Sequence, residues 1–143
     1  MFAHVVFVQT KLPRPRSVRT IIKANRAAPA IGPYSQAILT GGLIFVSGQI
    51  PLDPETGKLI TGNIVTQTHR VIQSIEAILE EAGAALKDVV HTTIFLIDLK
   101  DFSVMNGVYE TYFKPPEPAR STVQVAGLPK GACIEINAIA SLI

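Results

Sequence analysis

Residues 115–140, PPEPARSTVQVAGLPKGACIEINAIA, predict two apolar strands joined by a turn rich in glycine and proline. Each strand carries one charged side chain within its apolar region, Arg120 in the first and Glu135 in the second. A charge that is buried without a partner is strongly unfavourable. The two side chains therefore form either a structural ion pair or a functional site, and the faces on which they lie decide how the sheet is built.

Alternation along the two strands predicts that both charges point away from the core. In the second strand, one set of alternate residues is apolar throughout: Ile134, Ile136, Ala138, Ala140 and Leu142. Successive strand residues point to opposite faces, so this set should face the core and Glu135 the other side. In the first strand, Ser121, Val123 and Val125 alternate with Arg120, Thr122 and Gln124. We therefore expect Arg120 and Glu135 on one face of adjacent strands, where another chain would bury them.

Four further strands are predicted upstream, at residues 17–25, 34–40, 43–51 and 88–99. The second and third are separated only by Gly41 and Gly42, which is a strong hairpin signal. The third and fourth are separated by a helical pattern, described next. All six strands fit one mixed sheet.

Two segments have the apolar period of a helix. The first runs over residues 63–82, with Thr61 or Asn63 as its cap and Gly83 as its end. The second begins at a cap supplied by Asp101 and stops before two consecutive prolines. The complete order, three strands, helix, strand, helix and two strands, predicts an α+β fold with both helices on one face of the sheet. The other face should meet water or a partner subunit.

Composition favours a single globular domain, with 48% hydrophobic and 17% charged residues in a chain of 143. A net charge of +2 is too small to indicate a nucleic-acid partner by itself. Cys133 is the only cysteine, which excludes an intrachain disulfide, and the scattered histidines do not suggest a metal site. No apolar run has the length of about 20 residues that a bilayer requires, so we expect a soluble protein.

The first 20 residues differ from the rest, because they combine an apolar start with basic residues and no acid. This composition is typical either of a short organelle-targeting peptide or of an ordinary N-terminal extension. Residues 21–143 are then the folded domain. Both a cytoplasmic and a mitochondrial location stay open.

Arg120 and Glu135 allow two interpretations. In the first, they form a salt bridge at an interface. In the second, the planar guanidinium holds a substrate carboxylate through two parallel hydrogen bonds. Glu135, partly desolvated between subunits, would then act as a general base or orient a water. The residue pattern alone does not separate these interpretations.

Four other residues are weaker candidates: Tyr34, Ser47, Gly48 and Asn106. Ser47 has no neighbouring His and Asp in a nucleophile pattern, so its hydroxyl is expected to make hydrogen bonds rather than to attack. Gly48 either lets backbone amides approach a ligand or simply ends a strand. Tyr34 is either a substrate wall or a packing residue. Asn106 is a partly exposed helix residue unless a partner subunit covers it.

Four segments together resemble the RidA/YjgF family of enamine/imine deaminases, over about residues 21–142. They are APAIGPYSQAI, IFVSGQIPLDPETGKL, VVHTTIFLIDLKDFSVMNGVYETYF and PARSTVQVAGLPKGACIEINAIA. The resemblance implies a chorismate-mutase-like fold that assembles as a homotrimer, with active sites between subunits. It also implies hydrolysis of 2-aminoacrylate and related imino acids, which pyridoxal-phosphate enzymes release, to 2-oxo acids and ammonia. No cofactor would be needed.

The resemblance assigns a role to each candidate residue. Arg120 would bind the substrate carboxylate, and Glu135 would position and activate the attacking water. Gly48 would supply a backbone contact near the imine. The remaining candidates, Tyr34, Ser47 and Asn106, would line the cleft, some of them from the neighbouring chain.

Two positions depart from the family pattern. Thr122 stands where many relatives have a cysteine. If the family's contact at this position is made by the backbone N–H, threonine keeps it, whereas a role for the cysteine sulfur would be lost and activity or its sensitivity to oxidants would differ. Asn137 stands where close relatives often have a second glutamate, which lowers the local negative charge.

Two other functions stay open. Some family members are described as ribonucleases or translation inhibitors that act on single-stranded RNA, and the basic N-terminal residues favour that function here. The other is a non-catalytic, chaperone-like trimeric binding module, in which Arg120 and Glu135 would pair with no substrate between them.

Overall fold

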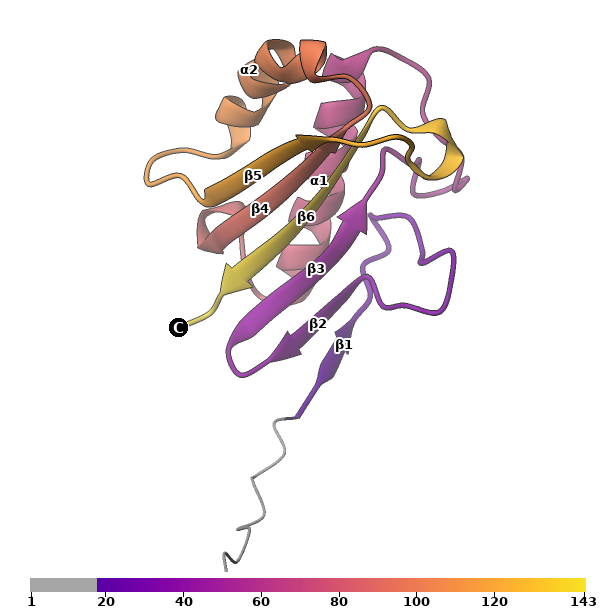
Figure 1. Cartoon of the computed structure of the whole chain (residues 1–143). Helices are drawn as coiled ribbons and strands as arrows, with labels where there is room; N and C mark the ends of the chain where they lie inside the picture. The colour runs from indigo at the N-terminus through magenta and orange to yellow at the C-terminus, as the bar shows by residue number, and fades with distance from the viewer. Residues whose placement is uncertain (1–17) are drawn as a thin grey trace, which may run out of the picture.

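The fold is a six-stranded mixed sheet with two helices, as the sequence predicts (Figure 1). The computed structural model describes residues 18–143, so the predicted N-terminal extension lies almost entirely outside the described residues. The strands are β1 (Thr20–Ile22), β2 (Ala37–Thr40), β3 (Leu43–Gln49), β4 (Val89–Leu96), β5 (Ala119–Gln124) and β6 (Ile134–Ser141). The helices are α1 (Ile64–Glu81) and α2 (Phe102–Tyr112).

The strand order is β1-β2-β3-β6-β4-β5, with β4 and β5 parallel and all other neighbours antiparallel. The last strand of the chain therefore lies in the interior of the sheet, between β3 and β4. The prediction that the two C-terminal strands are adjacent is wrong, because β4 lies between β5 and β6. Helix α2 connects β4 to β5, and a crossover of this kind is what a parallel strand pair requires.

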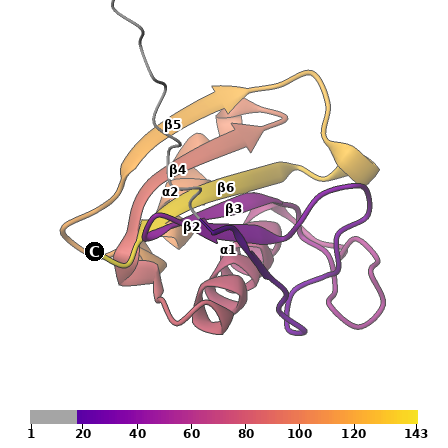
Figure 2. The ribbon, with the colours of Figure 1, turned by 90° about the horizontal axis from the view of Figure 1, so that it is seen from below.

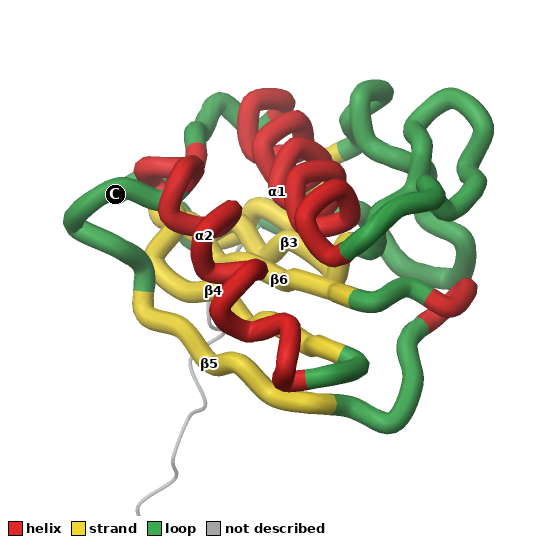
Figure 3. Tube along the Cα trace, turned by 90° about the horizontal axis from the view of Figure 1, so that it is seen from above, coloured by secondary structure: helices red, strands yellow, loops and turns green. Residues whose placement is uncertain are grey.

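Both helices lie on the same side of the sheet (Figures 2 and 3). The core forms between them and the inner residues of β6, of which Ile134, Ile136, Ala138 and Ala140 are buried. Helix α1 adds a fully buried apolar stripe: Val71, Ile72, Ile75, Ile78 and Leu79. Leu142 does not belong to this set, because β6 ends one residue earlier and the side chain is exposed.

The other face of the sheet is uncovered and apolar at its centre. Phe45 is 43% exposed and pairs with Ile38 on β2 and Ile139 on β6. Ile21 of β1, opposite Ile38, is 58% exposed. This face therefore presents a contiguous row of apolar side chains to the exterior of the chain.

The ends of α1 follow the prediction. The Oδ1 atom of Asn63 accepts a hydrogen bond of 3.1 Å from the Thr66 N–H, so Asn63 rather than Thr61 is the cap. Gly83 has a φ of +78°, the left-handed conformation in which glycine ends a helix. Neither helix of the described chain combines the length and apolar character that a membrane crossing requires.

The predicted cap of α2 is wrong. Asp101 makes no capping hydrogen bond with its side chain, because its backbone is already helical, with φ of −76° and ψ of −5°. A 3-10 helix (Leu99–Asp101) precedes α2, and Asp98 caps that element by accepting a 2.9 Å hydrogen bond from the Lys100 N–H. The helical stretch therefore begins one turn earlier than the sequence pattern indicates.

Asn63→Ala is expected to lower the free energy of unfolding by about 1 kcal/mol, because the Thr66 N–H loses its acceptor. Thr61→Ala, which removes the other candidate cap, should leave stability unchanged. Urea unfolding of the three proteins, followed by circular dichroism at one protein concentration, measures both effects. Equal losses in the two variants would contradict the assignment of Asn63 as the cap.

Candidate active site

A cavity of about 350 Å³ lies beside Glu135. Its lining residues are Ile31, Tyr34, Ser47, Gly48, Ile50, Pro129 and Glu135. Three of the residues singled out from the sequence, Tyr34, Ser47 and Gly48, thus gather around the carboxylate. Most of the remaining wall is apolar, which partly desolvates any group held there.

Gly48 leaves the space that the Glu135 side chain occupies. The register between β3 and β6 shifts between Val46 and Gln49, so Ser47 and Gly48 lie at an irregularity of the ladder. A Cβ atom built on Gly48 would lie 2.8 Å from the Cδ atom of Glu135 and would overlap one of its carboxylate oxygens. Any larger residue at position 48 must therefore displace the carboxylate.

Glu135 is half-buried, and burial raises the pKa of its carboxyl above the ordinary value. Within residues 18–143, the ion pair found is that between Arg26 and Glu80, on another part of the surface. No hydrogen bond to the Glu135 carboxylate occurs among the described residues either. An unpaired, partly desolvated carboxylate is a suitable proton acceptor near neutral pH.

Ser47 and the loop before β2 form the adjoining wall. The Ser47 hydroxyl donates a 2.6 Å hydrogen bond to the carbonyl of Ser35, and its N–H donates to the carbonyl of Gln36 at 2.9 Å. The hydroxyl is therefore engaged in holding the loop. Tyr34 lies in the same loop, 48% exposed, and its phenol oxygen accepts a 3.2 Å hydrogen bond from the Ile31 N–H.

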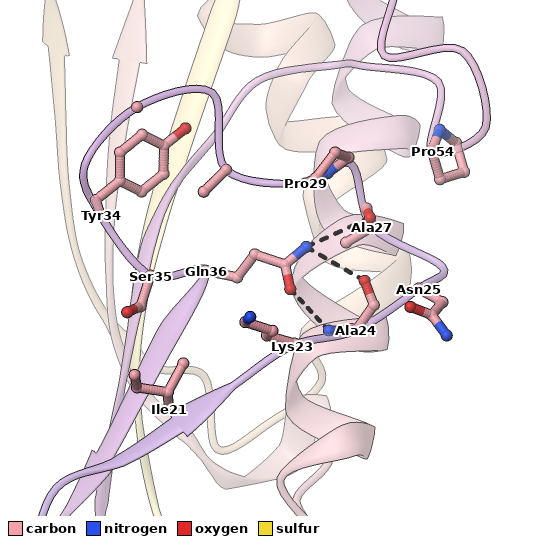
Figure 4. A pocket seen from close by; sticks show the side chains of 12 residues that line it. Ile21, Lys23, Ala24, Asn25, Ala27, Pro29, Tyr34, Ser35, Gln36 and Pro54 are labelled. Carbon is pink, nitrogen blue, oxygen red and sulfur yellow. Dashed lines mark hydrogen bonds between the residues drawn. The ribbon is translucent and has the colours of Figure 1, made fainter.

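Sequence reasoning missed Gln36, which anchors this loop. Its side-chain amide is buried, accepts a 2.7 Å hydrogen bond from the Ala24 N–H and donates to the carbonyls of Ala24 and Ala27 (Figure 4). It also donates to the carbonyl of Ala28. Tyr34 lines both the Glu135 cavity and a second cavity of about 550 Å³, which Gln36 also lines. The available signal was an amide directly before an apolar strand, where burial requires hydrogen-bond partners.

Arg120 lies in a different environment. Its Nη1 atom donates a 2.8 Å hydrogen bond to the Oδ1 atom of Asn106 on α2. Its guanidinium carbon lies 4.9 Å from the ring centre of Tyr109 and 5.6 Å from that of Phe102. A cavity of about 330 Å³ adjoins the group and is also lined by Glu110 and Glu117. The guanidinium is thus held by α2 but stays exposed.

The prediction that Arg120 and Glu135 share the uncovered face is wrong. Arg120 pairs with Thr92 of β4, whose side chain is buried on the helix side. Glu135 pairs with Phe95 of β4. Thr92 and Phe95 are three residues apart in one strand, so their side chains lie on opposite faces of the sheet. Val123, expected in the core, also pairs with Phe95 and is 42% exposed on the uncovered face. The two charges therefore point to opposite faces, and the hypothesis of an ion pair within one chain fails.

The physical reason is that β5 is an edge strand. Only β4 flanks it, and all its residues except Thr122 are exposed. Its polar side faces α2, where an amide and two aromatic rings receive the guanidinium. Thr122 lies on the same side, opposite Ile94, and its hydroxyl is buried without a hydrogen-bond partner among the described residues. The site residues thus form two groups, one around Glu135 and one around Arg120.

Comparison with known proteins agrees with the fold. Residues 25–142 match the model of the family described as endoribonuclease L-PSP. The chain belongs to this family, RidA/YjgF. A RutC family protein of Pyrococcus abyssi is 56% identical over 122 residues, which are 85% of this chain and 96% of the relative.

Two further RidA/YjgF relatives carry more specific names. A human 2-iminobutanoate/2-iminopropanoate deaminase is 44% identical over 123 residues, which cover 86% of this chain and 90% of the relative. The crystal structure of E. coli TdcF with bound serine is 40% identical and superposes with a TM-score of 0.80, covering 85% of this chain and 98% of that one. The name deaminase supports a hydrolytic enzyme.

Glu135→Gln is expected to raise the free energy of unfolding at neutral pH. A carboxyl whose pKa rises on folding binds a proton more tightly in the folded chain, so its contribution to stability falls as pH rises above the ordinary value of 4.5. Urea unfolding at about pH 4 and about pH 7, at equal protein concentration, measures the difference between the two proteins. The difference should be larger at the higher pH.

The matched control is Glu81→Gln, because Glu81 is an exposed glutamate at the end of α1. A stability difference between Glu135→Gln and the wild type that does not depend on pH would contradict a raised pKa at Glu135.

Proposed function

We propose that the protein hydrolyses 2-aminoacrylate and related enamine or imine intermediates, released by pyridoxal-phosphate enzymes, to 2-oxo acids and ammonia. The observation that carries the proposal is the unpaired carboxylate of Glu135 in a mostly apolar cavity. The exposed guanidinium of Arg120 supports it, because one of its five N–H donors is used on Asn106 and no other acceptor among residues 18–143 engages the remaining donors.

The proposal requires two copies of the chain at each site. Arg120 and Glu135 point to opposite faces of one sheet, so the Arg120 of one copy would approach the Glu135 cavity of another. A head-to-tail contact between two different surfaces of the same chain forms a ring when the rotation between copies closes. A homotrimer with three such sites fits this geometry. The apolar row around Phe45 on the uncovered face supplies surface that such an assembly would bury.

In the proposed reaction, Arg120 holds the carboxylate of the imino acid through two parallel hydrogen bonds. An enamine such as 2-aminoacrylate first takes a proton from solvent at its terminal carbon and so becomes the protonated imine. Glu135 accepts a proton from water, whose oxygen attacks the carbon of the protonated imine and gives a neutral tetrahedral carbinolamine. Glu135 then gives this proton to nitrogen. As the C–N bond breaks and the C=O bond forms, the hydroxyl proton passes through Glu135 to the departing ammonia, which leaves as ammonium.

Other residues have supporting roles in this proposal. The backbone of Gly48 would contact the imine, and the backbone N–H of Thr122 would contact the substrate on the Arg120 side. Tyr34 and Ser47 would line the cleft, and Asn106 would hold Arg120. The serine bound to TdcF carries the same carboxylate beside a nitrogen-bearing carbon, which is consistent with this class of substrate.

RNA cleavage is the second candidate, because the family description names an endoribonuclease. The surroundings of Arg120 argue against a polyanion, since Glu110 and Glu117 line the same cavity. An RNA substrate should therefore bind weakly at this position, and filter binding at physiological salt would detect any stronger association.

Substituting the two charged residues should have different kinetic effects. Arg120→Ala removes charge-assisted hydrogen bonds and should raise KM by about 10-fold to 100-fold. Glu135→Gln removes the proton acceptor and should lower kcat by about 100-fold or more. A threonine dehydratase in the same mixture generates the imine, and the assay measures how far the rate of 2-oxo acid release exceeds the rate of spontaneous hydrolysis. Arg19→Ala, on the exposed part of the chain, is the control.

No acceleration by the wild-type protein, or equal acceleration by Arg120→Ala, would overturn the proposed function. The first result, together with an assembled trimer, would favour the non-catalytic binding module.

Mixing the two impaired variants should restore activity, measured at a substrate concentration well below the raised KM, if each site takes Arg120 from one copy and Glu135 from another. Arg120→Ala and Glu135→Gln chains are unfolded together, refolded and assayed. About a quarter of the wild-type activity is expected from an equal mixture, because each site draws its two residues from independent copies. The same two proteins mixed without refolding are the control. Absence of recovery in a properly assembled mixture would show that one chain provides both residues.

A further inference from the structure

The aromatic ring beneath Arg120 is tied to the strand that neighbours it. Tyr109 is buried on α2, and its hydroxyl shares a 2.8 Å hydrogen bond with the Oγ1 atom of Thr92 on β4. Thr92 is the residue that lies opposite Arg120 in the parallel β4–β5 ladder. The guanidinium carbon of Arg120 lies 4.9 Å from the centre of the Tyr109 ring. These three residues therefore form a closed chain of contacts.

This arrangement fixes the position of the Tyr109 ring relative to the Arg120 side chain. The ladder holds the backbone of Arg120 beside that of Thr92, and the Thr92 hydroxyl holds the edge of the ring. Phe113 stacks on the ring, with centres 4.3 Å apart and planes at 28°. The ring thus has little freedom to turn or to withdraw from the guanidinium.

The remaining contacts of Arg120 come from the same helix. Phe102, Asn106 and Tyr109 are spaced by four and three residues, so they lie along one side of α2. Asn106 accepts from Nη1, while the rings of Phe102 and Tyr109 both approach the guanidinium. An exposed arginine with a free side chain samples many rotamers, and these contacts limit that freedom.

We infer that Tyr109 and Thr92 are positioning residues that hold the Arg120 guanidinium ready for a substrate carboxylate. This inference rests on the proposed role of Arg120 as the carboxylate-binding group. Restricting the side chain before binding reduces the entropy lost when the carboxylate is bound. The one N–H donor that the structure shows engaged is the one on Asn106, so the ring contacts add restraint without a further hydrogen bond among the described residues. Loss of the ring should therefore weaken carboxylate binding without slowing the chemical step.

Two sets of variants separate the ring from its hydroxyl. Tyr109→Leu removes the ring, whereas the pair Tyr109→Phe and Thr92→Val removes only the hydrogen bond and leaves no buried group unpaired. Tyr109→Leu is expected to raise KM by about tenfold with kcat changed less than about twofold. The double variant should raise KM by about threefold, because the ring remains but is less firmly held.

A binding measurement provides a readout that a purely structural role would not alter. Calorimetric titration with 2-oxobutyrate should give a Kd about tenfold higher for Tyr109→Leu than for the wild type. In the Arg120→Ala background, Tyr109→Leu should weaken 2-oxobutyrate binding no further, since the group that it positions is gone. Additive losses in the two variants would show that Tyr109 acts independently of Arg120 and would overturn the inference.

The outcomes also distinguish this inference from the proposed function. If Arg120→Ala leaves both KM and 2-oxobutyrate binding unchanged, the proposed function fails. If Arg120→Ala weakens binding while a folded Tyr109→Leu protein binds as the wild type does, the positioning role alone is overturned. If Tyr109→Leu does not fold, the volume-conserving double variant decides, and an unchanged KM in that protein overturns the positioning role.

Discussion

The pairing of β6 with both β3 and β4 is the constraint on which the rest of the structure depends. This register sets Ile136 against Ile94 on the helix side and Glu135 against Phe95 on the other. A slip of one residue would exchange the two faces. It would bury the Glu135 carboxylate beneath α1 and expose isoleucine, which is unfavourable on both counts. The apolar core thus determines where the site carboxylate lies.

The sequence was informative where two independent signals agreed. In β6, every second residue is apolar and buried, and the strand has a neighbouring strand on each side. The face on which Glu135 lies was therefore predictable. In α1, the helical period agrees with a cap at Asn63 and a left-handed Gly83. Gly41 and Gly42 likewise marked the β2–β3 hairpin. These features are local, and they suffice for the α+β class with both helices on one face.

The position of Arg120 was not predictable by the same rule, because β5 is an edge strand. Alternation indicates a core face only where one side of a strand is buried, and β5 is exposed on both sides apart from Thr122. The useful signal was topological: strand, helix and strand in succession favour a parallel pair of β4 and β5. In the sheet, β4 lies between β5 and β6. Partner side chains on α2 then decide which way the guanidinium points.

The separation of Arg120 from Glu135 has a direct electrostatic consequence for the proposed reaction. A guanidinium beside Glu135 in the same chain would pair with it and lower the pKa of its carboxyl, which would weaken it as a base. Because the chain holds the two groups on opposite faces, burial alone acts on Glu135 and raises its pKa. In the proposed assembly, the substrate carboxylate lies between them and neutralises Arg120. In that proposal it is the substrate carboxylate, by neutralising Arg120, that would keep Glu135 active as a base.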